Sequence, residues 1–311
     1  MKMIRLYFIV ILVLLVLSWG CEKRIDPELP EAPPLTFVDA WITNTYEPQI
    51  IRLNRTLPYF ENSEFPGITG ADVRITDNEN NEYVFIESEI TEGEYTWAPP
   101  SDTETFGKVG NQYILTISYD NTILEAISQM NRVPEIDSIS FRYEEGNSFF
   151  PESYFAGFYA VDPIGPGDTY WIKAYKNGVY LNKPDEINIA YDAGFSAGSE
   201  VDGITFIQPI RDGINPFEQD ENDDFLSPYA PGDSVYVEIH SISNFAFYYL
   251  TQVRVQIDRP GGFAELFATP LSNVVTNVVD VTNNEPLIGF FNVAAVSSKA
   301  DWLDPDNLPV E

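Results

Sequence analysis

Short segments in which apolar and polar residues alternate are the feature that most constrains how this chain can fold. Residues 71–76 (Ala-Asp-Val-Arg-Ile-Thr) place Val73 and Ile75 at alternate positions, and residues 234–240 repeat the pattern. Successive side chains of a β-strand point to opposite faces, so the alternation puts one face of each strand against a core. The pattern predicts a mostly β protein built from short strands.

The first block of predicted strands covers residues 35–132. Residues 77–82 (Asp-Asn-Glu-Asn-Asn-Glu) separate two of these strands, and asparagine tolerates the positive φ angles of a tight turn. We expect about seven strands, arranged as an immunoglobulin-like or transthyretin-like sandwich. The segment 131–134 (Asn-Arg-Val-Pro) marks the end of this block.

The second block, residues 133–300, combines strands with one helix. Asn177-Gly178 lies between two apolar runs, which is the strongest short signal for a β-hairpin, and residues 288–296 resemble a buried strand. We expect a second β-sandwich or a half-open barrel with one packed helix. The Pro- and Asp-rich residues 301–311 are expected to form a loose tail.

The single predicted helix covers residues 243–257. Its apolar residues recur every three or four positions and so form one stripe: Ile242, Phe245, Tyr249, Val253 and Ile257. Ser243 or Ser241 can cap its start, and Pro260-Gly261-Gly262 can end it.

The N-terminus has the pattern of a secretory signal peptide in residues 1–20. A basic start (Lys2, Arg5) precedes an apolar run from Leu6 to Leu17. Twelve residues would span roughly 18 Å as a helix, which is too short for a hydrocarbon core of about 30 Å. An uncleaved anchor helix is the alternative.

Cys21, the only cysteine, directly follows this segment. Lipidation explains both its position and its lack of a disulfide partner, with a free thiol as the alternative. Ser18 occupies a position where lipoprotein signals usually carry leucine, a departure similar to the signals of Bacteroidota. Residues 21–34 contain four prolines and predict an extended tether that can reach about 40 Å from the lipid.

The charge of the chain excludes several partners. The formal net charge is −31, and it becomes −33 when residues 1–20, with Lys2 and Arg5, are removed. Such an acidic protein is not expected to bind nucleic acid or to dock electrostatically on anionic lipid. Apolar residues make up 44% of the chain, which is enough to build a core.

Catalytic signatures are missing from the sequence. His240 is the only histidine, and no Gly-x-Ser-x-Gly motif accompanies it. Many carboxylates are present, but no pair of them is marked by its spacing. We therefore expect a protein that is not an enzyme.

The acidic segment 220–224 is a weak candidate for a calcium site. Asp220, Asn222 and Asp224 have the alternate spacing of calcium-loop ligands, but the turn glycine and the distal glutamate of an EF-hand are missing. A solvated acidic loop is the better interpretation, so no metal or other cofactor is expected beyond the lipid on Cys21.

Aromatic residues crowd residues 149–159. If they are exposed, they can stack on sugars or anchor a protein interface; if they are buried, they are ordinary core. The strand pattern favours core, with some side chains on each face. The crowded residues are Phe149, Phe150, Tyr154, Phe155, Phe158 and Tyr159.

These segments together resemble a Bacteroidota lipoprotein family known as domain of unknown function 4249. The resemblance covers most of residues 35–300. It is carried by residues 37–43, 51–56, 70–77, 232–243, 247–250 and 289–293, with Asp162-Pro163 and Asn177-Gly178 between them.

Members of this family look like outer-membrane lipoproteins that accompany SusC-like TonB-dependent transporters. The resemblance therefore implies a non-enzymatic lipoprotein, anchored to the bilayer through Cys21 and facing the cell exterior, that captures or gates substrate for a β-barrel partner. One alternative is a structural subunit of an outer-membrane assembly or secretion machine, and another is a glycan- or peptide-binding module. The mixed charges of residues 22–26 keep the periplasmic face as an alternative location.

Overall fold

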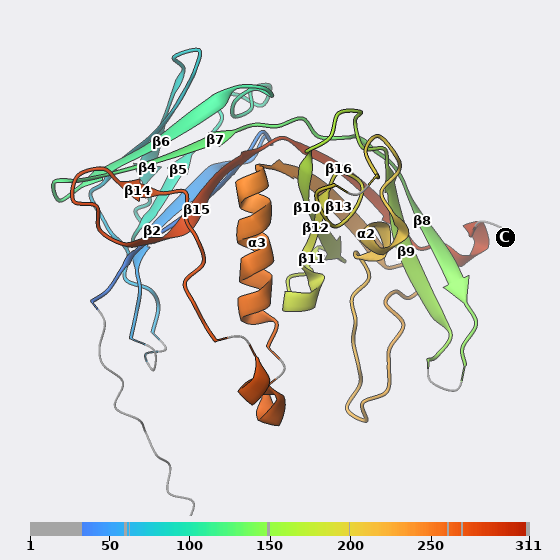
Figure 1. Ribbon diagram of the computed structural model, residues 1–311. Helices are drawn as coiled ribbons and strands as arrows, with labels where there is room; N and C mark the ends of the chain where they lie inside the picture. The colour runs from blue at the N-terminus through green and yellow to red at the C-terminus, as the bar shows by residue number, and fades with distance from the viewer. Residues whose placement is uncertain are drawn as a thin grey trace, which may run out of the picture. The chain divides into compact units, whose positions relative to one another are not determined.

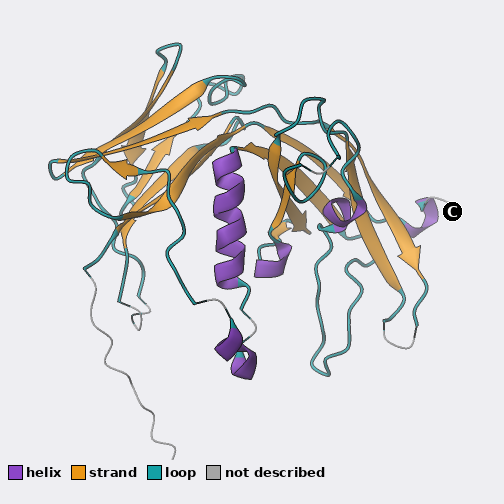
Figure 2. Cartoon of the chain, in the orientation of Figure 1, coloured by secondary structure: helices purple, strands orange, loops and turns teal. Residues whose placement is uncertain are grey.

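The fold is mostly β, as predicted, with far more residues in strands than in helices, and α3 is the longest helix of the described part (Figures 1 and 2). The computed structural model describes residues 33–308 except 59, 60, 62, 148, 149, 199, 260 and 269. The predicted signal peptide and Cys21 lie outside the described residues. From Pro34 onward the chain forms one unit. No helix within the described ranges is long and apolar enough to cross a membrane.

The largest sheet has nine strands in the order β14–β7–β6–β3–β4–β5–β2–β1–β15. Its strands are β1 (Thr36–Thr43), β2 (Gln49–Arg55), β3 (Asp72–Asp77), β4 (Glu82–Glu87), β5 (Glu94–Trp97), β6 (Gln112–Tyr119), β7 (Thr122–Gln129), β14 (Val279–Asp280) and β15 (Leu287–Ala294). The sheet curls until β15 meets β7, where the Val293 N–H donates a hydrogen bond to Ser128 Oγ at 3.0 Å. The result is a nearly closed, barrel-like sheet.

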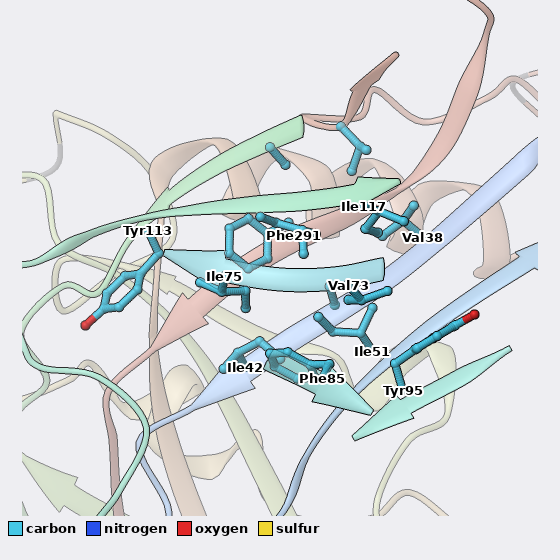
Figure 3. Close-up of a cluster of buried hydrophobic side chains, with 14 of the residues drawn as sticks. Val38, Ile42, Ile51, Val73, Ile75, Phe85, Tyr95, Tyr113, Ile117 and Phe291 are labelled. Carbon is cyan, nitrogen blue, oxygen red and sulfur yellow. The ribbon is translucent and has the colours of Figure 1, made fainter. Parts of the chain in front are cut away.

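Alternate residues of these strands fill the interior of the curled sheet (Figure 3). Val38 and Ile42 of β1, Ile51 of β2 and Ile75 of β3 are fully buried there, together with Phe291 of β15. The period-two pattern therefore identified the inward face of these strands correctly.

Strand β15 changes the domain organisation that the sequence suggested. It pairs in parallel with β1, so residues from the predicted second block complete the sheet of the first. Gly289 makes this pairing possible. It lies opposite Val38 with φ +102°, and a Cβ atom there would lie 1.9 Å from the Val38 carbonyl oxygen. Only glycine fits both the conformation and the space.

A second sheet of five strands follows in the order β11–β10–β13–β16, with β12 paired to β10. These strands are β10 (Thr169–Lys176), β11 (Val179–Tyr180), β12 (Asn188–Tyr191), β13 (Ser234–Ile242) and β16 (Val296–Trp302). A separate hairpin joins β8 (Ile136–Glu144) and β9 (Ser153–Ala160). The predicted Asn177-Gly178 turn connects β10 to β11. A core that includes Phe158, Ile172 and Val237 joins the sheet, the hairpin and the short helix α2 (Gln208–Asp212).

Helix α3 (Asn244–Ile257) confirms the predicted helix, and Ser243 caps it by accepting a hydrogen bond from the Ala246 N–H. The predicted apolar stripe is confirmed only in part, because Ile242 and Tyr249 pack in the core whereas Phe245 and Ile257 are exposed. The buried residues are Ala246, Phe247 and Leu250, whereas Phe245 is 43% exposed. The helix carries apolar side chains on several faces, so spacing alone does not fix which face is buried.

The end of the chain differs from the predicted loose tail. Strand β16 continues to Trp302, and Leu303 is buried in the core of the second sheet. Its backbone exchanges hydrogen bonds with Gly232 and Asp233. Short 3-10 helices complete the described elements: η1 (Pro184–Glu186), η2 (Gly262–Phe267) and η3 (Pro305–Asn307).

Candidate binding cleft

A cleft of about 680 Å³ opens where β1 and β2 of the large sheet face β10 and β11 of the second. The first wall follows from the alternation in β1. Ala40 and Ile42 point into the barrel-like core, so Asp39 and Trp41 point out of it and line the cleft. Arg52 of β2 lies directly opposite Asp39, with Nη1 3.6 Å from the carboxylate.

The second wall is built in the same way by β10. Ile172 and Ala174 are buried in the core of the second sheet, which leaves Trp171 and Lys173 on the opposite face. Tyr180 of β11 extends this wall, and it lines the cleft with Trp171 and Lys173. The cleft thus combines three aromatic rings with charged groups of both signs.

The tryptophan rings of the cleft are fixed by packing against each other and against further aromatic side chains. The Trp41 and Trp171 rings meet edge to face with centroids 5.1 Å apart, and Trp41 stacks on Phe290 at 5.6 Å. Phe290 in turn packs against Tyr249 of α3 at 4.5 Å. These contacts form a separate core that includes buried Leu250. The indoles are therefore fixed before any ligand arrives.

Lys173 is the most unusual group in the cleft. Its ammonium nitrogen lies 4.1 Å from the centroid of the Trp171 ring and 6.0 Å from that of Tyr180. Within the described residues no carboxylate lies in ion-pair distance of this nitrogen, and no hydrogen bond to it is present. Burial lowers the pKa of Lys173, which the charges of Glu238 and Asp39 only partly oppose.

His240 and Glu238 lie next to Trp171 and Lys173 on the same face of the sheet, since β13 pairs with β10. His240 Nε2 is 2.9 Å from a Glu238 carboxylate oxygen. Burial lowers the pKa of His240 to about 4, and the neighbouring Lys173 acts in the same direction. The imidazole is therefore neutral at pH 7 and donates to the carboxylate. His240 lies on the face of β13 opposite to that of the buried Val235, Val237 and Ile239.

The calcium candidates Asp220, Asn222 and Asp224 form a surface turn. One Asp220 carboxylate oxygen accepts the N–H groups of Asn222 at 2.8 Å and Asp224 at 3.0 Å. The other accepts the Asn222 amide at 3.2 Å. Asn222 and Asp224 are exposed and Asp220 is partly exposed, and these hydrogen bonds lower the pKa of Asp220. The local geometry is that of a turn closed by its first carboxylate.

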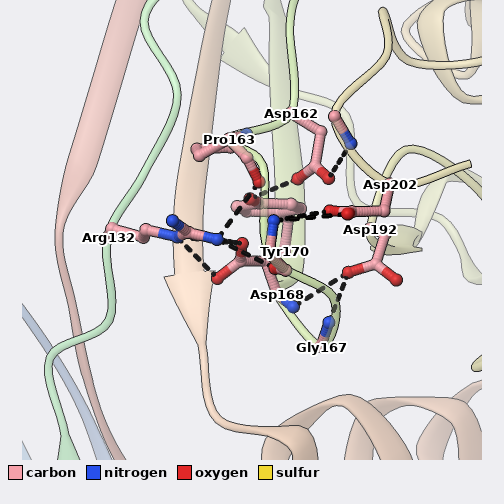
Figure 4. Close-up of polar contacts among 10 residues, drawn as sticks. Arg132, Asp162, Pro163, Gly167, Asp168, Tyr170, Asp192 and Asp202 are labelled. Atoms are coloured by element: carbon pink, nitrogen blue, oxygen red, sulfur yellow. Dashed lines mark hydrogen bonds and ion pairs between the residues drawn. The ribbon is translucent and has the colours of Figure 1, made fainter.

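A different acidic cluster, which the sequence did not indicate, brings together Asp162, Asp192 and Asp202 (Figure 4). Their carboxylate oxygens lie within 4.8 Å of one another, a spacing that could hold a metal ion. Asp162 accepts the Tyr170 hydroxyl at 2.7 Å, and Asp192 accepts the Gly167 N–H at 2.7 Å. These bonds hold the loop between β9 and β10, so a structural role accounts for the cluster.

Arg132 fixes the same loop from the other side. Its guanidinium donates to the Asp168 carboxylate and, at 2.8 Å, to the Gly165 carbonyl (Figure 4). Asp202 accepts the Gly165 N–H at 2.9 Å. The segment 131–134, predicted as a boundary, therefore leads from the large sheet to the β8–β9 hairpin and anchors a loop.

The structure divides the aromatic cluster of residues 149–159. Phe158 is fully buried, whereas Phe150 is 50% exposed and stacks on Phe225 at 4.9 Å. Phe150, Phe225 and Phe217 line a second pocket of about 270 Å³. Phe149 lies outside the described residues.

Fold and cleft together define a mostly β protein with an open, aromatic-lined cleft between a barrel-like sheet and a second sheet. The chain matches the family described as Domain of unknown function (DUF4249) over residues 22–300, and it belongs to that family. Among curated proteins no match is found.

Proposed function

We propose that this protein is a lipid-anchored, non-enzymatic accessory subunit of an outer-membrane TonB-dependent transporter of the SusC-like kind. In this proposal it faces the cell exterior and captures substrate for the barrel. The observation that carries the proposal is the open cleft with its fixed Trp41 and Trp171 rings and with Lys173, which has no ion-pair partner among the residues that the structure describes. Such a preformed, partly apolar site with a few polar groups is typical of ligand binding.

The groups near the cleft favour binding over catalysis. Asp39 is paired with Arg52, and burial raises the pKa of the Asp39 carboxyl although Arg52 opposes this. The only histidine, His240, is hydrogen-bonded to the carboxylate of Glu238. A general base must lie within hydrogen-bonding reach of a nucleophile or of a substrate proton. Asp39 and His240 are instead paired with Arg52 and Glu238. The N-terminal pattern ending at Cys21 supports the anchored location.

Purification from native outer membranes tests the proposed partnership. A C-terminally tagged full-length chain, extracted in mild detergent, is expected to bring with it one TonB-dependent β-barrel protein in near-equal amount. The tagged Cys21→Ala variant, which lacks the anchor, is the control. Recovery of the protein alone would contradict the proposal, and recovery of an assembly or secretion machine would favour that alternative.

Replacing Cys21 with alanine is expected to release the protein from the membrane. The apolar run from Leu6 to Leu17 would still direct export, but no lipid would hold the product. Fractionation should find the wild type in the membrane pellet and the variant in the soluble fraction, with the same circular dichroism spectrum. A variant that stays in the pellet would show that residues 4–17 themselves anchor the chain.

A further inference from the structure

We infer that the cleft takes a neutral pyranose unit of an oligosaccharide, an inference that rests on the proposed capture function and names its substrate class. The chemistry of the cleft has three parts. Aromatic rings offer apolar surface, Lys173 offers a donor that has no acceptor in the described part of the chain, and nearby carboxylates offer acceptors. A pyranose has the matching parts, because its ring carries apolar C–H faces and hydroxyl groups that both donate and accept hydrogen bonds.

The aromatic part is suited to stacking. Trp41, Trp171 and Tyr180 line the cleft from both walls; Trp41 stacks on Phe290, and Trp171 packs edge to face against Trp41. A planar ring that is already immobile loses little conformational entropy on binding, so little of the free energy gained by contact with a sugar face is lost to ordering the ring. Aromatic side chains with fixed orientations supply most of the energy at such sites.

The polar part argues for a neutral ligand. The positive charges of Lys173 and Arg52 are balanced by negative charges. These belong to Asp39 and Glu47 within the cleft and to Glu238 next to it. An anionic ligand would be repelled by these carboxylates and by the strongly negative net charge of the protein. A cationic ligand would be repelled by the ammonium group of Lys173. A polyhydroxyl compound satisfies donors and acceptors without adding charge.

Lys173 contributes the most specific interaction. Its ammonium is partly removed from water and lacks a hydrogen-bond acceptor within the described residues, so an acceptor supplied by a ligand gains a charge-assisted hydrogen bond. A sugar hydroxyl oxygen that contacts Trp171 lies within reach of this nitrogen, because the ammonium sits over the same ring. Removing the ammonium should therefore weaken the complex without disturbing the walls.

Titration of the full-length lipoprotein in detergent with neutral hexasaccharides tests this inference. The probes are maltohexaose, cellohexaose, xylohexaose and mannohexaose, with hexagalacturonate and hexaglucosamine as charged comparisons. At least one neutral probe is expected to bind saturably and to change the tryptophan fluorescence, since Trp41 and Trp171 line the cleft. Lys173→Met should raise the Kd of that probe at least about tenfold.

Lys108→Met is the matched control, because Lys108 is an exposed lysine in the loop between β5 and β6 that pairs with Glu79. It should bind the probe like the wild type, and both variants should melt at the wild-type temperature. Binding of none of the four neutral probes, binding of only a charged one, or an unchanged Kd in Lys173→Met would overturn the inference. Each of these results leaves the transporter partnership to be judged by the purification experiment, which does not depend on sugar binding.

Discussion

Replacing Gly289 with valine is expected to prevent stable folding of the nine-stranded sheet. A side chain at this position meets the Val38 carbonyl group across the parallel β1–β15 pair, and its φ of +102° is unfavourable for any residue with a Cβ atom. The backbone of β1 would have to move away from β15. We expect a loss of at least about 4 kcal/mol, which is a large part of the stability of a typical domain. Urea unfolding followed by circular dichroism measures it.

Gly70→Ala is the control for this prediction. Gly70 also has a positive φ, +72°, but nothing lies within 4 Å of the position that a Cβ atom would take. Its replacement should therefore cost only about 1 kcal/mol, which is the backbone penalty alone. If the two variants lost similar stability, the close approach of β1 to β15 would not be the reason for the glycine.

Acidification is expected to destabilise the protein through His240. The pKa of this imidazole is about 4 in the folded protein and 6.5 when it is free of its surroundings. Between these values the unfolded chain binds a proton that the folded protein does not, so the free energy of unfolding falls as the pH falls from 6.5 towards 4. Above pH 6.5 the stabilising contribution of the neutral imidazole is fully present. At 1.36 kcal/mol per pKa unit, the loss from pH 7 to pH 5 is about 2 kcal/mol.

His240→Gln isolates this contribution from the titration of the carboxylates. Glutamine can still donate a hydrogen bond to Glu238 but does not titrate. Urea unfolding at pH 7, 6 and 5 should show a smaller decline for the variant, and the difference from the wild type should reach about 2 kcal/mol at pH 5. Parallel pH profiles for the two proteins would mean that His240 is not held neutral by burial.

The strands and the helix could be predicted from the sequence because their signals are local. Alternation in residues 71–76 and 234–240, the Asn177-Gly178 turn and the Ser243 cap all concern neighbours in the chain. The parallel pairing of β15 with β1 could not be predicted, since 250 residues lie between Thr36 and its partner Leu287. Such pairings leave no local pattern, and Gly289 would only suggest a bulge or a close approach.

The candidate cleft was missed for a related reason. The sequence predicted the strands that carry Trp41, Trp171 and Lys173, and alternation alone gives the face on which each residue lies. What the sequence did not show is that the outward face of β1 meets the outward face of β10. The acidic segment 220–224 and the aromatic cluster of residues 149–159 were more visible because their members are adjacent in the chain.

The position of β15 also sets the order of events when the chain is made. Strand β1 lies between β2 and β15, so it remains an uncovered edge until residues 287–294 have been synthesised. The first sheet therefore cannot close before this distant segment has been made and has paired with β1. An exposed edge that persists this long invites pairing with other chains. Shielding of the β1 edge until residues 287–294 pair with it is therefore expected to limit association of the protein with other chains during folding.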